Sequence, residues 1–174
     1  MKNYLTLYEL TNLINEAISL SFEDSIKLVA EINSFTEHKK SGHAYLELIE
    51  KRGNNVVAKM RAIIWASTYK VIKIYFKTAT GTDLKEGIKI LCTGKVYFHN
   101  VYGLSFQIFD IDPQYTIGEW ALRRQEIISR LEKEGLIDLN KSLDFPILAQ
   151  KIAVISSPTA AGLEDFRKHL QQNI

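Results

Sequence analysis

The sequence predicts a mainly β fold in which five short strands form a closed barrel and helices precede, interrupt and follow them. Three segments between residues 25 and 65 alternate apolar and polar residues with a period of two, which is the pattern of a half-buried strand, and two further segments between residues 88 and 113 have strand character. Turns containing glycine or asparagine separate neighbouring strands. The segment between the third and fourth strands has the period of a helix instead, and this inserted helix favours a barrel over a sandwich.

The first predicted element is a short amphipathic helix over residues 6–20, with Thr6 as its N-cap. Two strands are predicted next, at 25–35 and 43–51. The loop 36–42 between them has the length and the glycine of a hairpin connection. The apolar residues of the helix recur at helical spacing and are Leu10, Leu13, Ile14, Ala17 and Ile18.

The order of the remaining elements predicts the type of barrel. Tyr69, Ile72 and Phe76 are spaced as on one face of a helix. Three strands, one helix and two strands form the connectivity of an OB-fold, a five-stranded Greek-key barrel that binds oligonucleotides or oligosaccharides. A small β-sandwich is the competing architecture, and the single inserted helix favours the barrel. The elements predicted after the second strand are a turn at 52–55, a strand at 56–65, the helix at 66–79 and strands at 88–100 and 102–113.

The sequence changes character after Pro113. A charged helix is predicted over 116–135, ending at Gly135, and an irregular linker follows it. From Lys151 an apolar strand, a Ser-Ser-Pro-Thr turn and the start of a helix form half of a βαβ unit, so we expect a truncated α/β domain. The predicted parts are the N-terminal helix with the barrel (1–114), a linker helix and loop (115–150) and the truncated α/β start (151–174).

Composition excludes several classes of protein. A single cysteine, Cys92, rules out a disulfide framework and a cysteine-based zinc site, which fits a reducing, cytoplasmic setting. The four histidines do not combine with carboxylates at metal-binding spacing, so we expect neither a metal nor another cofactor. We find no signal-peptide pattern and no apolar run long enough to span a bilayer.

Charge is distributed unevenly along the chain. Residues 25–100 carry thirteen Lys or Arg and six Asp or Glu, although the whole chain has a formal charge of only +2. A basic middle region is typical of a protein with a polyanionic partner. Solvated strand faces and a lysine-rich helix would produce the same count.

The outward faces of the second and third strands carry the candidate site. Single-stranded nucleic acid needs flat apolar surfaces for its bases and cations for its phosphates, and these faces hold both. Packing under a neighbouring helix, or binding to a protein or a sugar, is the alternative. The candidate nucleic-acid-binding residues are Asn33, Phe35, Lys39, Lys40, His43, Tyr45, Lys59, Arg61 and Trp65.

Four stretches of the chain resemble the N-terminal part of the exodeoxyribonuclease VII large-subunit family. They are LTLYELTNLINEAI, AEINSFTEHKKSGHAYLEL, GLID at 135–138 and IAVISSPTAAGLEDF, and they occur in the family's order. The chain departs from the family's pattern at Ala30, where a glycine is usual, at Asn33–Ser34, where two residues are exchanged, and in TAAG, where the glycine is displaced.

This resemblance implies a nuclease that degrades single-stranded DNA to oligonucleotides, with a small subunit as its partner. It places the family's acidic catalytic residue at Asp165 and the other catalytic positions beyond Ile174. We therefore expect these 174 residues to be a fragment that binds single-stranded DNA without cleaving it. A non-enzymatic OB-fold module that binds RNA or serves subunit assembly is the alternative function.

Overall fold

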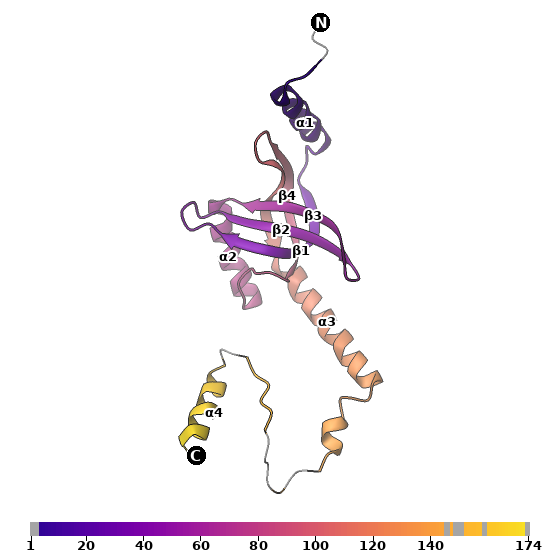
Figure 1. The fold of residues 1–174 in the computed structure, drawn as a ribbon, viewed down its shortest axis with the longest axis vertical. Helices are drawn as coiled ribbons and strands as arrows, with labels where there is room; N and C mark the ends of the chain where they lie inside the picture. Colours follow the sequence, from indigo (N-terminus) through magenta and orange to yellow (C-terminus); the bar gives the residue numbers. More distant parts are fainter. Residues whose placement is uncertain (1–3, 145–146, 148–151, 158–159, 173–174) are drawn as a thin grey trace. The chain divides into compact units, whose positions relative to one another are not determined.

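The computed structural model describes residues 4–144, 147, 152–157 and 160–172, which fall into two compact units, residues 1–130 and 131–174. The first unit contains the barrel and its flanking helices (Figure 1). The helices and strands predicted for residues 6–113 are all confirmed. In chain order the elements are α1 (Leu7–Ser21), β1 (Ile26–Glu37), β2 (Ala44–Arg52), β3 (Asn55–Ile64), α2 (Ala66–Thr80), β4 (Lys89–His99), β5 (Gly103–Asp112) and α3 (Pro113–Lys133).

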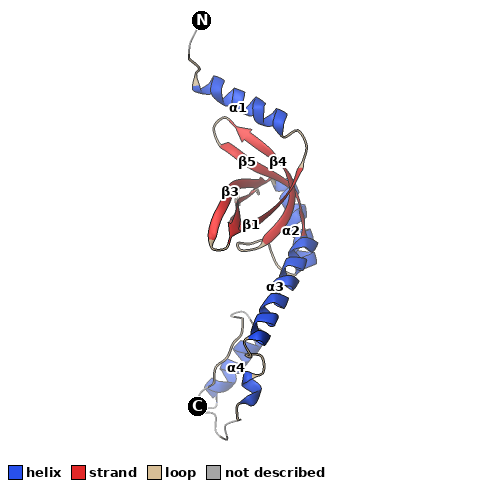
Figure 2. Cartoon of the chain, turned by 90° about the vertical axis from the view of Figure 1, so that its right-hand side faces the viewer, coloured by secondary structure: helices blue, strands red, loops and turns tan. Residues whose placement is uncertain are grey.

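The five strands form a closed barrel in the order β1-β2-β3-β5-β4. Figure 2 shows the strands curving around the barrel. The OB-fold prediction is therefore confirmed, and the sandwich is excluded. β1 closes the barrel because it pairs antiparallel with β4 over Ile26–Glu31 and with β2 over Glu31–Glu37. The pairing of β3 with β5 is parallel and short, and it sets Ala62 opposite Phe106.

Alternate residues of the strands fill the barrel interior, as the period of two predicts. α2 packs against this core through Tyr69, Ile72 and Phe76, the three residues predicted for its buried face. Cys92 is also in the core, and burial raises the pKa of its thiol to about 12, so it is not a candidate nucleophile. The fully buried strand residues include Ile32, Leu48, Ile64, Ile90, Phe106 and Ile108.

A β-bulge in β1 changes which residues face the core. The register shifts between Ile32, which lies opposite Leu48, and Ser34, which lies opposite Glu47. Asn33 is the extra residue, so the alternation is displaced by one position beyond it. Phe35 consequently faces inward and packs against the core, although simple alternation from Ile26 places it on the outer face.

α3 begins at Pro113, directly after β5 and three residues earlier than predicted. Proline is well tolerated at the first helical position because its missing N–H would have no partner within the helix. The Thr116 side chain is fully buried and donates a hydrogen bond from Oγ1 to the Lys89 carbonyl at 3.0 Å. Lys89 Nζ lies 2.9 Å from Glu119 Oε2, so the first two turns of α3 are attached to β4.

The second unit differs from its prediction. It contains a short 3-10 helix, Leu139–Ser142, and α4, Ala161–Gln172, which confirms the predicted helix. The predicted apolar strand is wrong for residues 152–157, which are exposed and have no secondary structure. A strand needs a hydrogen-bonded neighbour, and the described part of this unit supplies none. Lys151 and the Pro158–Thr159 part of the turn lie outside the described residues.

Across the described ranges, none of the helices combines the length and the apolar character needed to cross a bilayer.

We expect Gly94→Ala to destabilise the barrel. A Cβ at this position in β4 would lie against the Gln107 carbonyl oxygen and 2.7 Å from the Phe106 ring, both in β5. Such overpacking costs about 1–3 kcal/mol or more, so the free energy of unfolding measured in urea should fall by that amount. Gly118→Ala in α3 is the matched control, because a Cβ there has open space around it among the described residues and should add up to about 1 kcal/mol of helix stability. A Gly94→Ala protein as stable as the wild type would contradict the close approach of β4 and β5.

Candidate nucleic-acid interface

The loop between β1 and β2, residues 38–43, is closed by its own hydrogen bonds. The His38 backbone N–H donates to the His43 carbonyl at 2.9 Å, and the Gly42 N–H donates to the His38 carbonyl at 2.8 Å. Gly42 has φ of 72°, a conformation that favours glycine. Lys39 and Lys40 are exposed in this loop.

His43 attaches the end of this loop to α2. Its Nδ1 accepts a hydrogen bond from the Ala66 backbone N–H at 3.0 Å, and Ala66 is the first residue of α2. The imidazole therefore satisfies one of the N–H groups that a helix leaves without an internal partner. The same contact sets the His43 ring edge-on to the Trp65 ring, with centroids 4.7 Å apart and planes at 89°.

Four rings gather at this end of the sheet, and we call them the aromatic cluster: His38, His43, Tyr45 and Trp65. The Tyr45 ring lies 6.4 Å from His43 and 6.5 Å from His38, both nearly perpendicular. Tyr45 is 46% exposed and Trp65 is 40% exposed, so each ring is fixed by neighbours and still offers area to a ligand. Three of the four were predicted. His38 was not predicted as part of this cluster. Its position, five residues before His43 across a hairpin loop, could have indicated that the two rings lie close together.

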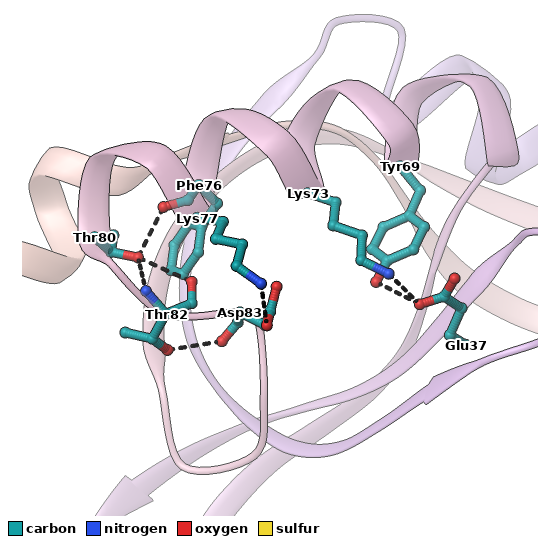
Figure 3. Close-up of polar contacts among 8 residues, drawn as sticks. All are labelled: Glu37, Tyr69, Lys73, Phe76, Lys77, Thr80, Thr82 and Asp83. Atoms are coloured by element: carbon teal, nitrogen blue, oxygen red, sulfur yellow. Dashed lines mark hydrogen bonds and ion pairs between the residues drawn. The ribbon is translucent and has the colours of Figure 1, made fainter. Parts of the chain in front are cut away.

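The start of the same loop is attached to α2 by a second set of contacts, drawn in Figure 3. Glu37 Oε2 accepts hydrogen bonds from Lys73 Nζ at 2.7 Å and from the Tyr69 hydroxyl at 3.1 Å. The bond from Lys73, followed by that from Tyr69, lowers the pKa of the Glu37 carboxyl, and burial raises the pKa of Tyr69. Both ends of the loop are thus held by the first turns of α2, which fixes the aromatic cluster relative to the barrel.

The charged residues on the outer face of β2 and β3 surround a carboxylate. Glu47 Oε1 lies 2.7 Å from Lys59 Nζ, and Glu47 Oε2 accepts a hydrogen bond from Asn33 Nδ2 at 2.5 Å. Arg61 lies directly opposite Glu47 in the strand register. The bond from Lys59, then that from Asn33, lowers the pKa of the Glu47 carboxyl. Asn33, Lys59 and Arg61 are therefore brought together as predicted, but around an acidic residue that the sequence patterns did not single out.

Phe35 is the one predicted surface residue that lies elsewhere. Because of the bulge it faces the core, and its ring centroid is 6.0 Å from that of Tyr69. Ser34 and Thr36 occupy the outer face instead, opposite Glu47 and Tyr45 respectively. The segment around the bulge contains neither glycine nor proline, so its sequence carries no sign of the phase change.

The predicted catalytic residue lies in the second unit. Asp165 is exposed on α4, in the second turn of the helix. The described residues contain no group of three or more histidine, cysteine or acidic side chains that could hold a metal ion.

Comparison with known proteins agrees with this geometry. A family model described as an OB-fold nucleic acid binding domain matches residues 5–112. The exodeoxyribonuclease 7 large subunit of Deinococcus radiodurans is 36% identical over 173 residues, covering 96% of this chain and 41% of that protein. The protein of the same name from Bacillus cytotoxicus is 32% identical over 167 residues, covering 95% of this chain and 34% of that protein.

Solved structures with a similar arrangement include the mitochondrial single-stranded DNA binding protein Rim1 of S. cerevisiae. It is 17% identical, has a TM-score of 0.38, and the match covers 51% of this chain and 91% of that one. The N-terminal domain of PriB from Thermoanaerobacter tencongensis is 14% identical, has a TM-score of 0.34, and the match covers 52% and 94%.

The chain belongs to the family of OB-fold nucleic acid binding domains. Along nearly its whole length it is similar to exodeoxyribonuclease 7 large subunits, which confirms the resemblance noted in its sequence motifs. It spans about two-fifths of the Deinococcus radiodurans relative and a third of the Bacillus cytotoxicus one.

We expect the Glu37 contacts to make stability depend on acidity. A carboxyl whose pKa is lowered by folding stabilises the protein above its ordinary pKa, and that contribution is lost as the pH falls through the lowered value. Thermal melts from pH 7 to about pH 3 should therefore show Glu37→Gln less stable than wild type at pH 7 and nearly equal at the acid end. Glu50→Gln is the control, because the described contacts include no partner for Glu50. A gap between Glu37→Gln and wild type that stays constant with pH would contradict this role.

Proposed function

We propose that the barrel binds single-stranded DNA across the outer face of β2 and β3 and the loop 38–43. The observation that carries this proposal is the aromatic cluster, whose Tyr45 and Trp65 rings are held in place and still 40–46% exposed beside Lys39 and Lys40. Fixed, half-exposed rings offer stacking surfaces to bases, and nearby lysines attract phosphates. The family's description as a nucleic acid binding domain supports the same ligand class.

Single strands suit this surface better than a duplex does. The rings meet edge to face, at 80° to 89°, so their faces are not stacked on one another and can accept bases. Only an unpaired strand has bases free to stack on protein rings, because duplex bases are stacked on each other. Lys39 and Lys40 have no competing carboxylate in the loop 38–43, so they can meet the backbone that follows the bases.

We further propose that the full-length protein hydrolyses phosphodiester bonds in single-stranded DNA, in the cytoplasm and together with a small subunit. The names of the large-subunit relatives support this activity, and the barrel would deliver DNA to a catalytic domain that begins near Lys151. Asp165 is the candidate acid–base residue. A single exposed carboxylate does not make a general acid–base pair, so the 174 residues alone should bind DNA without cleaving it.

A role in assembly is the second candidate, and α1 is the observation in its favour. Its apolar face is exposed, with Leu10 at 45%, Leu13 at 51% and Leu20 at 67%. Exposed apolar surface of this kind is common where another protein binds. Binding of RNA rather than DNA is a third outcome, because base stacking does not distinguish the two.

Fluorescence anisotropy with labelled oligo-dT, duplex DNA and RNA at two salt concentrations tests the proposal. We expect preference for the single strand and weaker binding at the higher salt. Tyr45→Ala should weaken oligo-dT binding by about fivefold to a hundredfold, because one stacked base contributes about 1–3 kcal/mol.

Tyr75→Ala is the matched control, since this tyrosine is 54% exposed on α2 outside the aromatic cluster. Trp65→Ala should be examined by circular dichroism as well, because Trp65 also precedes α2 and contacts His43. Equal binding by Tyr45→Ala and wild type, or a preference for duplex, would refute the proposed surface. Preference for RNA would support the third candidate.

Glu47→Gln is expected to raise the affinity for oligo-dT. The Glu47 carboxylate binds Lys59 and Asn33 and lies opposite Arg61. Its removal therefore leaves two cations, Lys59 and Arg61, free to bind phosphates. One additional phosphate contact steepens the dependence of log affinity on log salt by about 0.7 for a single strand. Glu119→Gln is the control, because Glu119 of α3 forms a comparable ion pair with Lys89 of β4, away from the proposed surface. A Glu47→Gln protein with unchanged or lower affinity would show that phosphates do not reach this part of the face.

A further inference from the structure

Helix α1 presents most of its apolar residues to solvent and not to the barrel. Its half-buried residues are Thr11, Asn15 and Ile18, which recur at helical spacing, so the side of α1 that faces inward is mainly polar. The contact with the barrel includes a hydrogen bond from Asn100 Nδ2 to Asn12 Oδ1 at 2.7 Å. The exposed apolar residues lie along another side of the helix. We call them the α1 stripe: Leu10, Leu13, Ile14, Ala17 and Leu20.

Helix α2 has a comparable stripe on the side that points away from the core. Val71 is 68% exposed and Ile74 is 69% exposed, and with Tyr75 they form what we call the α2 stripe. Residues at i, i+3 and i+4 lie next to one another on a helix, which is how a helix forms a surface that packs on another helix. Single exposed apolar residues are normal, but contiguous ones mark surfaces where another protein binds.

The two stripes are bordered by opposite charges. α1 contains Glu9 and Glu16 and no lysine or arginine, whereas α2 contains Lys70, Lys73 and Lys77 and no aspartate or glutamate. Glu9 and Glu16 are seven residues apart, as are Lys70 and Lys77, so both pairs span about 10.5 Å along their helices. Viewed from each N-terminus, both pairs lie on the same border of their stripe. Antiparallel packing of the helices therefore sets Glu16 beside Lys70 and Glu9 beside Lys77.

Glu16 and Lys70 are the least engaged of these four residues. Glu9 accepts hydrogen bonds within the capping box of α1, and Lys77 Nζ lies 3.0 Å from Asp83 Oδ2. Within the described part of the chain, neither Glu16 nor Lys70 has an ion-pair partner. Pairing of α1 with α1 would set glutamates against glutamates, and pairing of α2 with α2 would set lysines against lysines. Like charges across a contact oppose association, so α2 is the complementary partner for α1.

We propose that the chain associates with a second copy of itself, with the α1 stripe of one copy packed antiparallel on the α2 stripe of the other. The contact joins two different surfaces, so each copy retains one stripe for a further identical contact. One contact between two helices of 15 residues is smaller than a standard protein interface, so the association is weak and depends on concentration. This inference gives the assembly role proposed above its partner and rests on that role. It is independent of DNA binding.

Sedimentation velocity over a range of micromolar concentrations tests the contact. Leu13→Gln and Ile74→Gln should each raise the Kd of self-association at least about tenfold, because each removes an apolar side chain from the middle of the contact. Glutamine is a good helix former, so both helices should persist, as circular dichroism would verify. Leu122→Gln is the matched control, because this leucine is 63% exposed on α3, outside both stripes.

Mixing the two variants shows whether the contact joins unlike surfaces. Leu13→Gln retains an intact α2 stripe and Ile74→Gln retains an intact α1 stripe, so an equal mixture should associate although neither variant does so alone. Glu16→Lys and Lys70→Glu should each weaken self-association about threefold or more, and the double variant should recover it because the charges are exchanged.

A chain that remains monomeric throughout the concentration range would overturn this association, as would a mixture of Leu13→Gln and Ile74→Gln that remains monomeric. Oligo-dT affinity is measured by anisotropy on the same proteins, and we expect it to be unchanged in both variants. A wild-type chain that associates without binding oligo-dT would refute only the proposed DNA surface. A monomeric chain that binds oligo-dT would refute only the contact between α1 and α2.

Discussion

The pairing of one strand with two partners holds this structure together. β1 is hydrogen-bonded to β4 along its first half and to β2 along its second half, and this double pairing closes the barrel. The bulge at Asn33 follows shortly after the last pair with β4 and lies within the pairing with β2. A bulge bends its strand and increases the local twist, which suits a strand that changes neighbours. The same bulge leaves Asn33 on the outer face, turns Ser34 to the outer face and turns Phe35 to the inner one. Architecture and candidate surface therefore share a single cause.

The local order of the surface follows from hydrogen bonds that also stabilise α2. His43 caps the helix through Nδ1, and Glu37 binds Tyr69 and Lys73 in its first two turns. A loop held at both ends loses less conformational entropy on binding than a mobile loop would. The rings of the aromatic cluster are consequently preorganised, and for the proposed single-stranded DNA ligand this favours recognition by stacking geometry over recognition by net charge.

The barrel is predictable from sequence because the inward positions of β2 and β4 and the buried face of α2 follow regular periods. Leu46, Leu48 and Phe76 illustrate this, since each is buried where its period places it. The orientation of Phe35 is not predictable, because a bulge is a property of two paired strands and not of the bulged segment alone. Glu47 is missed for a similar reason, since its partners come from β1 and β3. At residues 152–157 the apolar pattern predicts a strand, but strand formation depends on a neighbour that the described unit does not contain.

The parallel contact between β3 and β5 has a consequence for how the barrel forms and opens. It consists of two residue pairs, and α2 and β4 lie between its partners in the chain. Parallel pairing is slightly less stable per residue than antiparallel pairing, and contacts between distant segments form after local ones because their loops must close first. Ile63 and Gln107 form one of these two pairs, and Ile63 also lies opposite Tyr45 of the aromatic cluster. The seam beside Tyr45 therefore has fewer paired residues than the antiparallel seams of the barrel, so fewer ladder hydrogen bonds oppose a local opening there.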